Sequence, residues 1–207
     1  MKFYLSSYQI GNEINKLKGL VSNNNKTAYI SNALDFSDDL ERRRESEEFD
    51  INQLREVGLE VETLDLRDYF NQPNKLKKDI LKYGVIWVRG GNVFVLRQAM
   101  KLSGFDNLLK DTLEKRKNLL YGGYSAGICV LAPNLKGLEL VDDMNQKPYK
   151  GQSDLIWEGL GIINYVIIPH YKSDHPESEA VNKVVKYFEK CKIPFKALRD
   201  GEVIIIE

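Results

Sequence analysis

The sequence predicts an α/β fold with a three-layer, doubly wound, mainly parallel sheet. Two observations lead to this prediction. Short apolar runs rich in β-branched residues alternate along the 207 residues with longer segments whose apolar residues recur at helical spacing. Some of the short runs are apolar throughout, which is typical of parallel strands that are covered on both faces. Because no repeat, low-complexity tract or shift of composition divides the chain, we expect one domain over residues 1–207.

The first part of the chain contains two predicted helices between predicted strands. A helix through Ile14, Leu17 and Leu20 follows the first strand, and a charged helix over about residues 38–57 follows the second. Its run at 41–48 mixes both charge signs at helical spacing, so we expect a solvated face. The apolar runs of the predicted strands at 61–66 and 85–88 are continuous enough for a sheet covered on both faces. The four predicted strands cover residues 2–6, 27–30, 61–66 and 85–88.

The second part of the chain contains four more predicted strands. Residues 119–123 run straight into a helix that opens at Ser125, and a last helix spans about residues 177–190. We expect the final two strands to form a hairpin that turns at Asp200-Gly201. In a doubly wound sheet, ligands bind at the carboxyl ends of the strands, so functional residues are sought there. The remaining predicted strands cover residues 165–168, 195–198 and 203–206.

Composition and charge exclude several classes of protein. The chain is 43% hydrophobic and 29% charged, so it is neither disordered nor embedded in a membrane. Its 30 basic and 30 acidic residues balance, which predicts no general attraction to nucleic acid or to a membrane surface. The apolar run at the amino terminus is too short for a signal peptide, and Cys129 and Cys191 have no zinc or redox spacing. We expect a cytoplasmic protein without a metal that acts on a small molecule or peptide.

Residues 123–127, Gly-Tyr-Ser-Ala-Gly, match the Gly-x-Ser-x-Gly pattern of a nucleophile elbow. This turn between a strand and a helix exposes a strained nucleophile, and small residues two positions before and after it avoid the crowded backbone. The amino terminus of the helix also directs N–H groups toward developing negative charge. An apolar strand precedes Ser125 and a helix-compatible segment follows it, so we interpret Ser125 as a nucleophile rather than part of a structural turn.

His170 is the candidate general base. It follows the apolar run at 165–168 directly, which predicts that it lies at the same sheet edge as Ser125. An imidazole with a pKa near neutrality could accept the serine proton and return it to a leaving amine. His175, the other histidine, stands in the polar segment 172–176 and is interpreted as a loop or capping residue.

A triad also needs a carboxylate to orient the imidazole, and two places offer one. Asp200 follows a strand, but an ordinary Asp-Gly turn explains it equally well. Asp142 and Asp143 could also serve, or could be solvated loop charges. The paired glycines Gly90-Gly91 after the fourth strand would let backbone N–H groups approach a ligand, so we interpret this loop as an oxyanion hole.

Three segments together resemble the peptidase E (aspartyl dipeptidase) family, whose wider relatives include cyanophycinase. They are Gly90–Phe94, Gly123–Gly127 and Ile168–Tyr171, and their order and spacing also fit. The resemblance covers nearly the whole chain. It implies a flavodoxin-like fold akin to class I glutamine amidotransferases, with serine in place of their nucleophilic cysteine, and peptide hydrolysis without a cofactor.

The resemblance implies that Ser125 is the nucleophile, His170 the base and Gly91 an oxyanion donor through its backbone. The backbone N–H of Ala126 is expected to be the second donor. For the acid, the resemblance allows either Asp142 or Asp143 after the serine, or the late Asp200. We prefer Asp200 because it follows a strand and could lie beside His170.

The substrate is less well defined by the resemblance. Selectivity of the family for an amino-terminal Asp depends on a basic group, for which Arg89, Lys172 and Arg199 are all candidates. Asn92, Tyr171 and Arg199 are the candidate substrate-binding residues. The segment at 141–144, Val-Asp-Asp-Met, departs from the threonine-rich Asp-Met segment of the family. The resemblance also allows a homodimer, because family members can self-associate.

Three other interpretations compete with a peptidase. The same fold could support an amidase or esterase that acts on non-peptide substrates, although the order Ser, His, Asp argues against a standard α/β-hydrolase. A flavodoxin-like binding protein could retain the elbow without turnover. Cys129 is a poor nucleophile candidate, because it lies about one helical turn after Ser125 and is expected to face the core.

Overall fold

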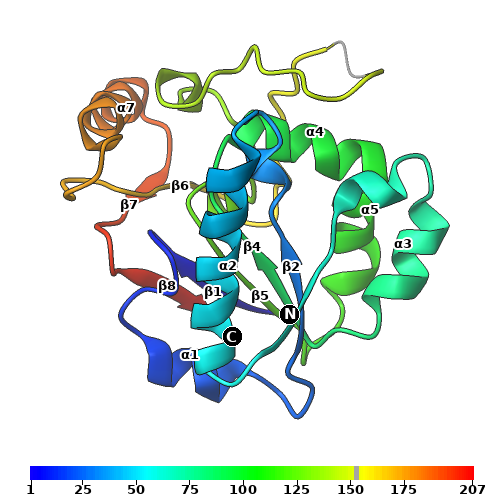
Figure 1. Ribbon diagram of the computed structural model, residues 1–207. Coiled ribbons are helices and arrows are strands. Elements are labelled where there is room, and N and C mark those ends of the chain that lie inside the picture. The colour runs from blue at the N-terminus through cyan, green and yellow to red at the C-terminus, as the bar shows by residue number, and fades with distance from the viewer. Residues whose placement is uncertain (152–153) are drawn as a thin grey trace.

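A six-stranded sheet with helices on both faces forms the centre of the molecule (Figure 1). The computed structural model describes residues 1–151 and 154–207. The strand order is β3-β2-β4-β5-β1-β8, with β8 antiparallel to β1 and the other neighbours parallel. The predicted doubly wound, mainly parallel sheet is therefore confirmed. The strands of this sheet are β1 (Lys2–Ser6), β2 (Lys26–Ile30), β3 (Glu60–Thr63), β4 (Val85–Val88), β5 (Leu120–Tyr124) and β8 (Val203–Ile206).

The helices form two layers because successive strand residues point to opposite faces. Tyr4 of β1 packs with Leu17 and Leu54 on one face, whereas Phe3 and Leu5 belong to the larger core on the other. Helices α1 (Ile14–Leu20) and α2 (Leu40–Glu56) cover the first face. The second face carries α3 (Pro73–Ile80), α4 (Val93–Ser103), α5 (Phe105–Leu108) and α6 (Ala126–Cys129), with α7 (Ser178–Cys191) also packed on this core. Short turns of 3-10 helix are η1 (Asn32–Leu34), η2 (Leu66–Tyr69) and η4 (Leu138–Leu140), and η3 (Leu109–Leu113) is a π-helix.

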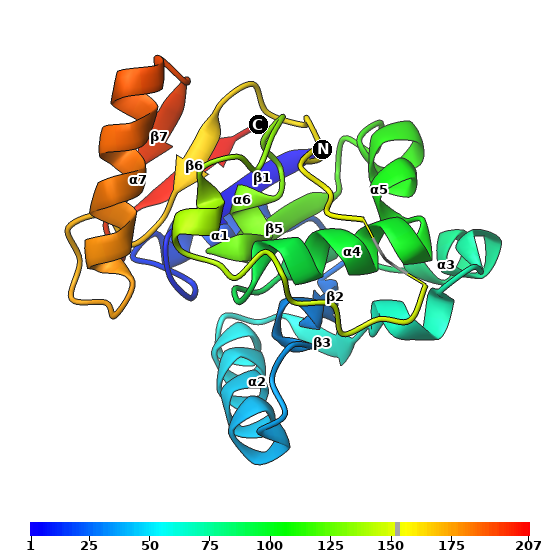
Figure 2. The same ribbon diagram turned by 90° about the horizontal axis from the view of Figure 1, so that it is seen from above.

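A second, two-stranded parallel sheet lies beside α7 (Figure 2). It consists of β6 (Val166–Ile168) and β7 (Phe195–Ala197). The predicted hairpin between the last two strands is therefore wrong. A turn does form at Arg199–Glu202, where the N–H of Glu202 donates to the carbonyl of Arg199, but it leads the chain from the small sheet to the large one.

Two further predictions about strands need correction. The strand predicted at residues 165–168 was placed in the sheet that carries Ser125, but in the described part of the chain β6 pairs with β7 alone. The strand predicted at 61–66 was expected to be covered on both faces, yet β3 has the burial pattern exposed, half-buried, exposed, exposed. Among the described strands it pairs with β2 alone, so it is an edge strand, and little of the core covers its side chains.

The carboxyl ends of three neighbouring strands position the candidate site. In register, Val88 of β4 and Leu5 of β1 both lie opposite Gly123 of β5, so the loops after these strands begin side by side. In the small sheet, Ile168 of β6 lies opposite Ala197 of β7, which brings the loops after those strands together in turn. In the described part of the chain, no helix is both long and apolar enough to cross a membrane.

Candidate active site

Ser125 stands on a strained turn between β5 and α6. Its backbone has φ 49° and ψ −121°, a conformation that is rare for a residue with a side chain. Such a conformation costs about 1–3 kcal/mol and persists only where the surrounding structure enforces it. The predicted nucleophile elbow has this geometry, in which the serine is held at the carboxyl end of the strand.

The two glycines of the motif are required by the closeness of β4. A Cβ atom on Gly123 would lie 2.2 Å from the carbonyl oxygen of Val88, and one on Gly127 would lie 2.0 Å from the same oxygen. Backbone atoms cannot move aside cheaply, so any larger residue would push the elbow away from β4. The crowding that the motif predicts on both sides of Ser125 is therefore confirmed.

His170 is buried at the end of β6 and directly contacts Asp200. It is 2% exposed, and its Nδ1 lies 2.8 Å from Oδ1 of Asp200. The contact arises because β6 and β7 are parallel, so that the residues following them leave the same edge of the small sheet. The predicted proximity of Asp200 and His170 is confirmed, and it leaves Nε2 as the ring nitrogen available for proton transfer.

Ser7 links the small sheet to the large one. Its Oγ accepts a hydrogen bond from the backbone N–H of His170 at 2.9 Å and donates to Oδ1 of Asp200 at 2.9 Å. Ser7 follows β1 and is fully buried. Asp200 is held further by its backbone N–H, which donates to Oγ of Ser173 at 2.8 Å. The imidazole and the carboxylate are therefore fixed relative to the strand that neighbours β5.

The other two carboxylates lie elsewhere. The half-buried Asp142 accepts a hydrogen bond from the backbone N–H of Val93 at 2.8 Å, at the amino terminus of α4. Burial raises the pKa of Asp142 to about 7. Asp143 is exposed and accepts from the backbone N–H of Asn145 at 2.9 Å. No hydrogen bond connects either of them to His170 among the described residues.

Backbone N–H groups from two loops are available beside Ser125. Gly90 approaches it so closely that a Cβ there would lie 2.8 Å from Cβ of Ser125. Gly91 has φ 137°, and a Cβ there would lie 2.5 Å from the carbonyl oxygen of Ala33, so both positions require glycine. In the described structure, the N–H groups of Gly91 and Ala126 donate to no acceptor. These are the two donors expected for an oxyanion hole.

A cavity of about 140 Å³, which we call the catalytic cavity, lies beside Ser125 and Gly91. Ser125, His170, Gly91 and Arg89 line it, so the nucleophile and the base face the same space. No hydrogen bond joins Ser125 to His170 among the described residues. Catalytic hydrogen bonds are often long before substrate binds and tighten in the complex. The arrangement is suited to attack on a carbonyl carbon that is placed in this cavity.

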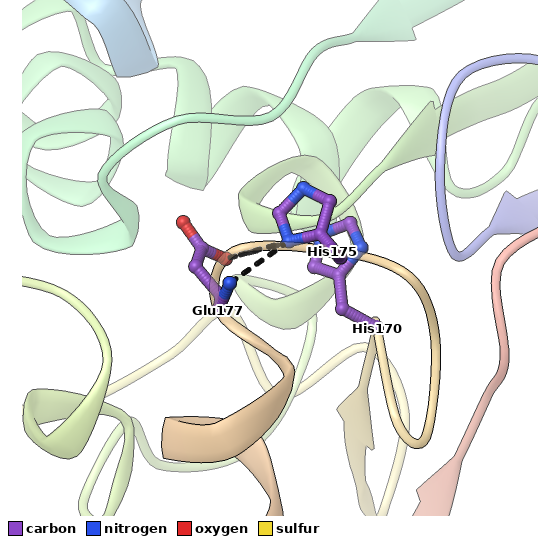
Figure 3. A group of neighbouring side chains, drawn as sticks. All are labelled: His170, His175 and Glu177. Atoms are coloured by element: carbon purple, nitrogen blue, oxygen red, sulfur yellow. Dashed lines mark hydrogen bonds and ion pairs between the residues drawn. The ribbon is translucent and has the colours of Figure 1, made fainter.

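His175 and Glu177 cover the imidazole of His170 (Figure 3). The two imidazole rings stack with centroids 3.7 Å apart and 8° between their planes. Oε2 of Glu177 lies 4.0 Å from Nε2 of His170 and 4.0 Å from Nδ1 of His175. The backbone N–H of Glu177 donates to Nδ1 of His175 at 3.3 Å, which holds the second ring in place.

The same three side chains are the candidate metal ligands, since their donor atoms all lie within 4.8 Å of one another. A zinc ion binds a ring nitrogen at about 2.0–2.1 Å along the lone pair, which lies in the ring plane. A single ion cannot lie in the planes of two rings that are parallel and 3.7 Å apart. His175 would have to leave the stack before the group could bind a metal.

Burial and the neighbouring charge of His175 lower the pKa of His170 to about 4, despite the opposing effect of Asp200. His170 is neutral above that pKa and can accept a proton there, whereas below it the protonated ring cannot act as a base. We therefore expect kcat/KM for peptide hydrolysis to fall in acid with a midpoint near pH 4 rather than at the usual histidine value of 6.5.

This expectation is checked by a pH profile of kcat/KM between pH 3.5 and 8, with circular dichroism at each pH to show that the protein stays folded. His175→Asn, which removes the adjacent charge, should move the midpoint upward. A midpoint at or above pH 6.5 in the native protein would contradict the buried, neutral state of His170.

Most of the predicted substrate-binding residues lie away from the catalytic cavity. The Asn92 side chain caps α4, where it accepts from the N–H groups of Phe94 and Val95. Arg199 and Lys172 are exposed, and Lys172 stacks over the ring of Tyr171. None of these four candidates lines the catalytic cavity as described, whereas Arg89 does.

Comparison with known proteins identifies the family. Residues 9–207 match Peptidase family S51. The chain belongs to this family, the peptidase E family of serine peptidases. The resemblance inferred from the three motifs is therefore confirmed.

Curated relatives of this S51 chain are themselves uncharacterized peptidases. One from Pasteurella multocida is 26% identical over 61% of this chain and 58% of its own length. One from Listeria monocytogenes is 30% identical over 68% of this chain and 64% of its own length. The chain thus spans about three fifths of the length of these relatives.

Two solved structures share the fold of this S51 chain. A candidate peptidase E protein from Listeria monocytogenes EGD-e has a TM-score of 0.74 at 22% identity, covering 99% of this chain and 93% of that one. A peptidase from an acI-B1 Actinobacterium has a TM-score of 0.68 at 16% identity, covering 100% of this chain and 83% of that one. At these identities the likeness supports the α/β fold.

The sequence did not indicate Ser7 or Glu177 as residues of this S51 site, nor the stacking of His175 on His170. Ser7 had a weak signal, because it follows the first predicted strand and so stands at the carboxyl edge of the sheet. The sequence carries no signal for the positions of His175 and Glu177, since these depend on how the loop after β6 folds back over His170. The buried thiol of Cys129 agrees with its expected place in the core.

Proposed function

We propose that this chain is a serine peptidase that cleaves small peptides through an acyl-enzyme formed on Ser125. The observation that carries the proposal is the 2.8 Å contact between Nδ1 of His170 and Asp200, in a site where His170 and Ser125 line one cavity. A carboxylate in that position orients the ring and stabilises the imidazolium that forms during catalysis.

In the proposed mechanism, Oγ of Ser125 attacks the peptide carbonyl carbon while Nε2 of His170 takes the hydroxyl proton. The negative oxygen of the tetrahedral intermediate accepts hydrogen bonds from the N–H groups of Gly91 and Ala126. The C–N bond then breaks and His170 returns the proton to the leaving amine. Water, deprotonated in turn by His170, hydrolyses the ester on Ser125 and releases the acid.

The test combines covalent labelling with a substrate panel. A fluorophosphonate should modify Ser125 in the native protein, as located by peptide mass spectrometry, and should abolish cleavage of dipeptides. The panel contains Asp-Leu, Glu-Leu and Ala-Leu. Labelling together with cleavage supports the peptidase, and cleavage confined to Asp-Leu would make it an aspartyl dipeptidase.

Two outcomes of this test support other functions. Labelling without cleavage of any peptide favours an amidase or esterase on the same fold. A protein that neither reacts nor cleaves contradicts the proposed triad and favours a binding protein. Selectivity for amino-terminal Asp, a cytoplasmic location and a homodimer stay predictions from the sequence.

A further inference from the structure

Arg89 is a buried cation whose hydrogen-bonding capacity is only partly used. It follows β4 directly and is 7% exposed. Its Nη2 donates to Oγ of Ser46 at 3.0 Å, and its Nε lies 3.5 Å from Oδ2 of Asp50. Nε and Nη1 have no hydrogen-bond partner among the described residues. Buried donors without acceptors are costly, so a guanidinium left in this state requires an explanation such as a ligand that completes it.

Arg89 also lies where the catalytic cavity meets a second cavity. It lines the catalytic cavity, and it lines a neighbouring cavity of about 350 Å³ formed with α2 and the loop before it. Leu34 lines both spaces, and the exposed ring of Phe36 lines the second. We call the second space the α2 cavity. Besides this apolar surface it is lined by the guanidinium groups of Arg89, Arg42 and Arg43 and by one carboxylate, Asp39. An excess of positive charge beside apolar surface suits a residue that has an apolar side chain and a free carboxylate.

Ser125 also borders a third space, which is lined by residues of α6 and α7. A small cavity of about 30 Å³ there is lined by Ser125, Asp142 and Glu177 together with apolar side chains. Glu177 also lines the catalytic cavity, so it is the small size of this space that excludes the released residue from it. His170 lines the catalytic cavity but not this one. Because the base returns its proton to the leaving nitrogen, the leaving residue belongs on the side of His170 and Arg89.

We infer that Arg89 binds the carboxylate of the residue that cleavage releases, so that the enzyme acts on the last peptide bond of short peptides. The leaving side chain packs on Leu34 and Phe36 in the α2 cavity. This inference rests on the proposed peptidase function and specifies how its site selects substrates. A planar guanidinium suits this role because it can donate two parallel hydrogen bonds to a carboxylate.

The first test compares Ala-Leu with its carboxyl-terminal amide, Ala-Leu-NH₂, on the native enzyme. We expect kcat/KM to be about 10- to 100-fold higher for the acid, the range given by a hydrogen bond to a charged group. Arg89→Gln should bring the ratio of the two values close to one, and Arg89→Lys should keep part of it. Equal kcat/KM values for acid and amide on the native enzyme would overturn the inference without any variant.

Two controls separate recognition from structural damage. Asp50→Asn disturbs the buried pair but leaves the guanidinium, so it should lower both kcat/KM values alike and keep their ratio. The ratio is insensitive to the fraction of folded protein. This matters because loss of Arg89 removes the cation beside Asp50 and leaves that buried carboxylate with the hydroxyls of Tyr29 and Tyr124. If Arg89→Gln instead alters the preference for Asp-Leu over Ala-Leu and leaves the acid-to-amide ratio unchanged, Arg89 reads the acyl side chain and the inference is wrong.

Binding to an inactive variant separates this inference from the proposed function. Calorimetry on Ser125→Ala should show Ala-Leu binding at least about tenfold more tightly than its amide, and Arg89→Gln on that background should remove the difference. That result would support the inference even if the native protein cleaved no peptide. Equal binding of acid and amide would overturn it, while cleavage by the native enzyme would leave the peptidase intact.

Discussion

Replacing Ser125 with alanine should lower kcat for peptide hydrolysis by about 10⁶-fold, as loss of the nucleophile does in triad enzymes. The hydroxyl stands on the strained elbow and lines the catalytic cavity together with Gly91 and His170. Without the hydroxyl, the acyl-enzyme cannot form, and only binding and the oxyanion donors remain. Steady-state cleavage of the best dipeptide in the panel measures the loss.

The matched control is Cys129→Ser, which alters the nearest thiol. Cys129 is buried with its Sγ on the carbonyl oxygen of Ile167, and burial raises its pKa well above the usual range. A thiol kept protonated in this way is a poor nucleophile, so this variant should keep kcat within about tenfold of the native value. Native-like turnover by Ser125→Ala, or a collapse with Cys129→Ser alone, would contradict the assignment of the nucleophile.

Replacing Asp200 with asparagine should lower kcat by about 10⁴-fold, the effect of the same change in a characterised triad. The carboxylate holds Nδ1 of His170 at 2.8 Å and leaves Nε2 free to accept the serine proton. An amide of similar shape can donate a hydrogen bond to Nδ1, which favours the tautomer that has its proton on Nε2. The base is then blocked although the ring stays in place, and single-turnover acylation kinetics would show the defect in the first chemical step.

Asp142→Asn and Asp143→Asn are the matched controls for the acid. Asp143 is exposed and only caps its own turn, so its replacement should leave kcat near the native value. Asp142 accepts from the N–H of Val93, and its replacement should affect stability more than turnover. Circular dichroism establishes folding of each variant. A large loss with Asp142→Asn or Asp143→Asn, with Asp200→Asn still active, would show that the acid has been placed wrongly.

The elbow was predictable from sequence because its geometry is local. Gly123, Ser125 and Gly127 lie within five residues, between an apolar strand and a helix, so the motif is recognised without reference to the rest of the chain. The sequence also favoured Asp200 over the other carboxylates as the neighbour of His170, since each of the two residues follows a short apolar run. Their contact depends on the parallel pairing of β6 with β7. The sequence instead favoured a hairpin between the last two strands.

The division into two sheets could not be read from the sequence. Strands β6 and β7 are three residues long, and a run of that length carries no information on its partner. Their pairing is set by distant contacts, among them the packing of Val181, Val184 and Phe188 of α7 into the same core. The bridging role of Ser7 was hidden for a related reason, because its two partners lie 163 and 193 residues further along the chain.

These large separations also bear on how the molecule reaches its native state. The strand β1, made early, pairs with β5 and with β8, and contacts so distant in sequence tend to form slowly. Ser7, which follows β1, bonds to both His170 and Asp200, so these two residues reach their places only when contacts across 163 and 193 residues have formed.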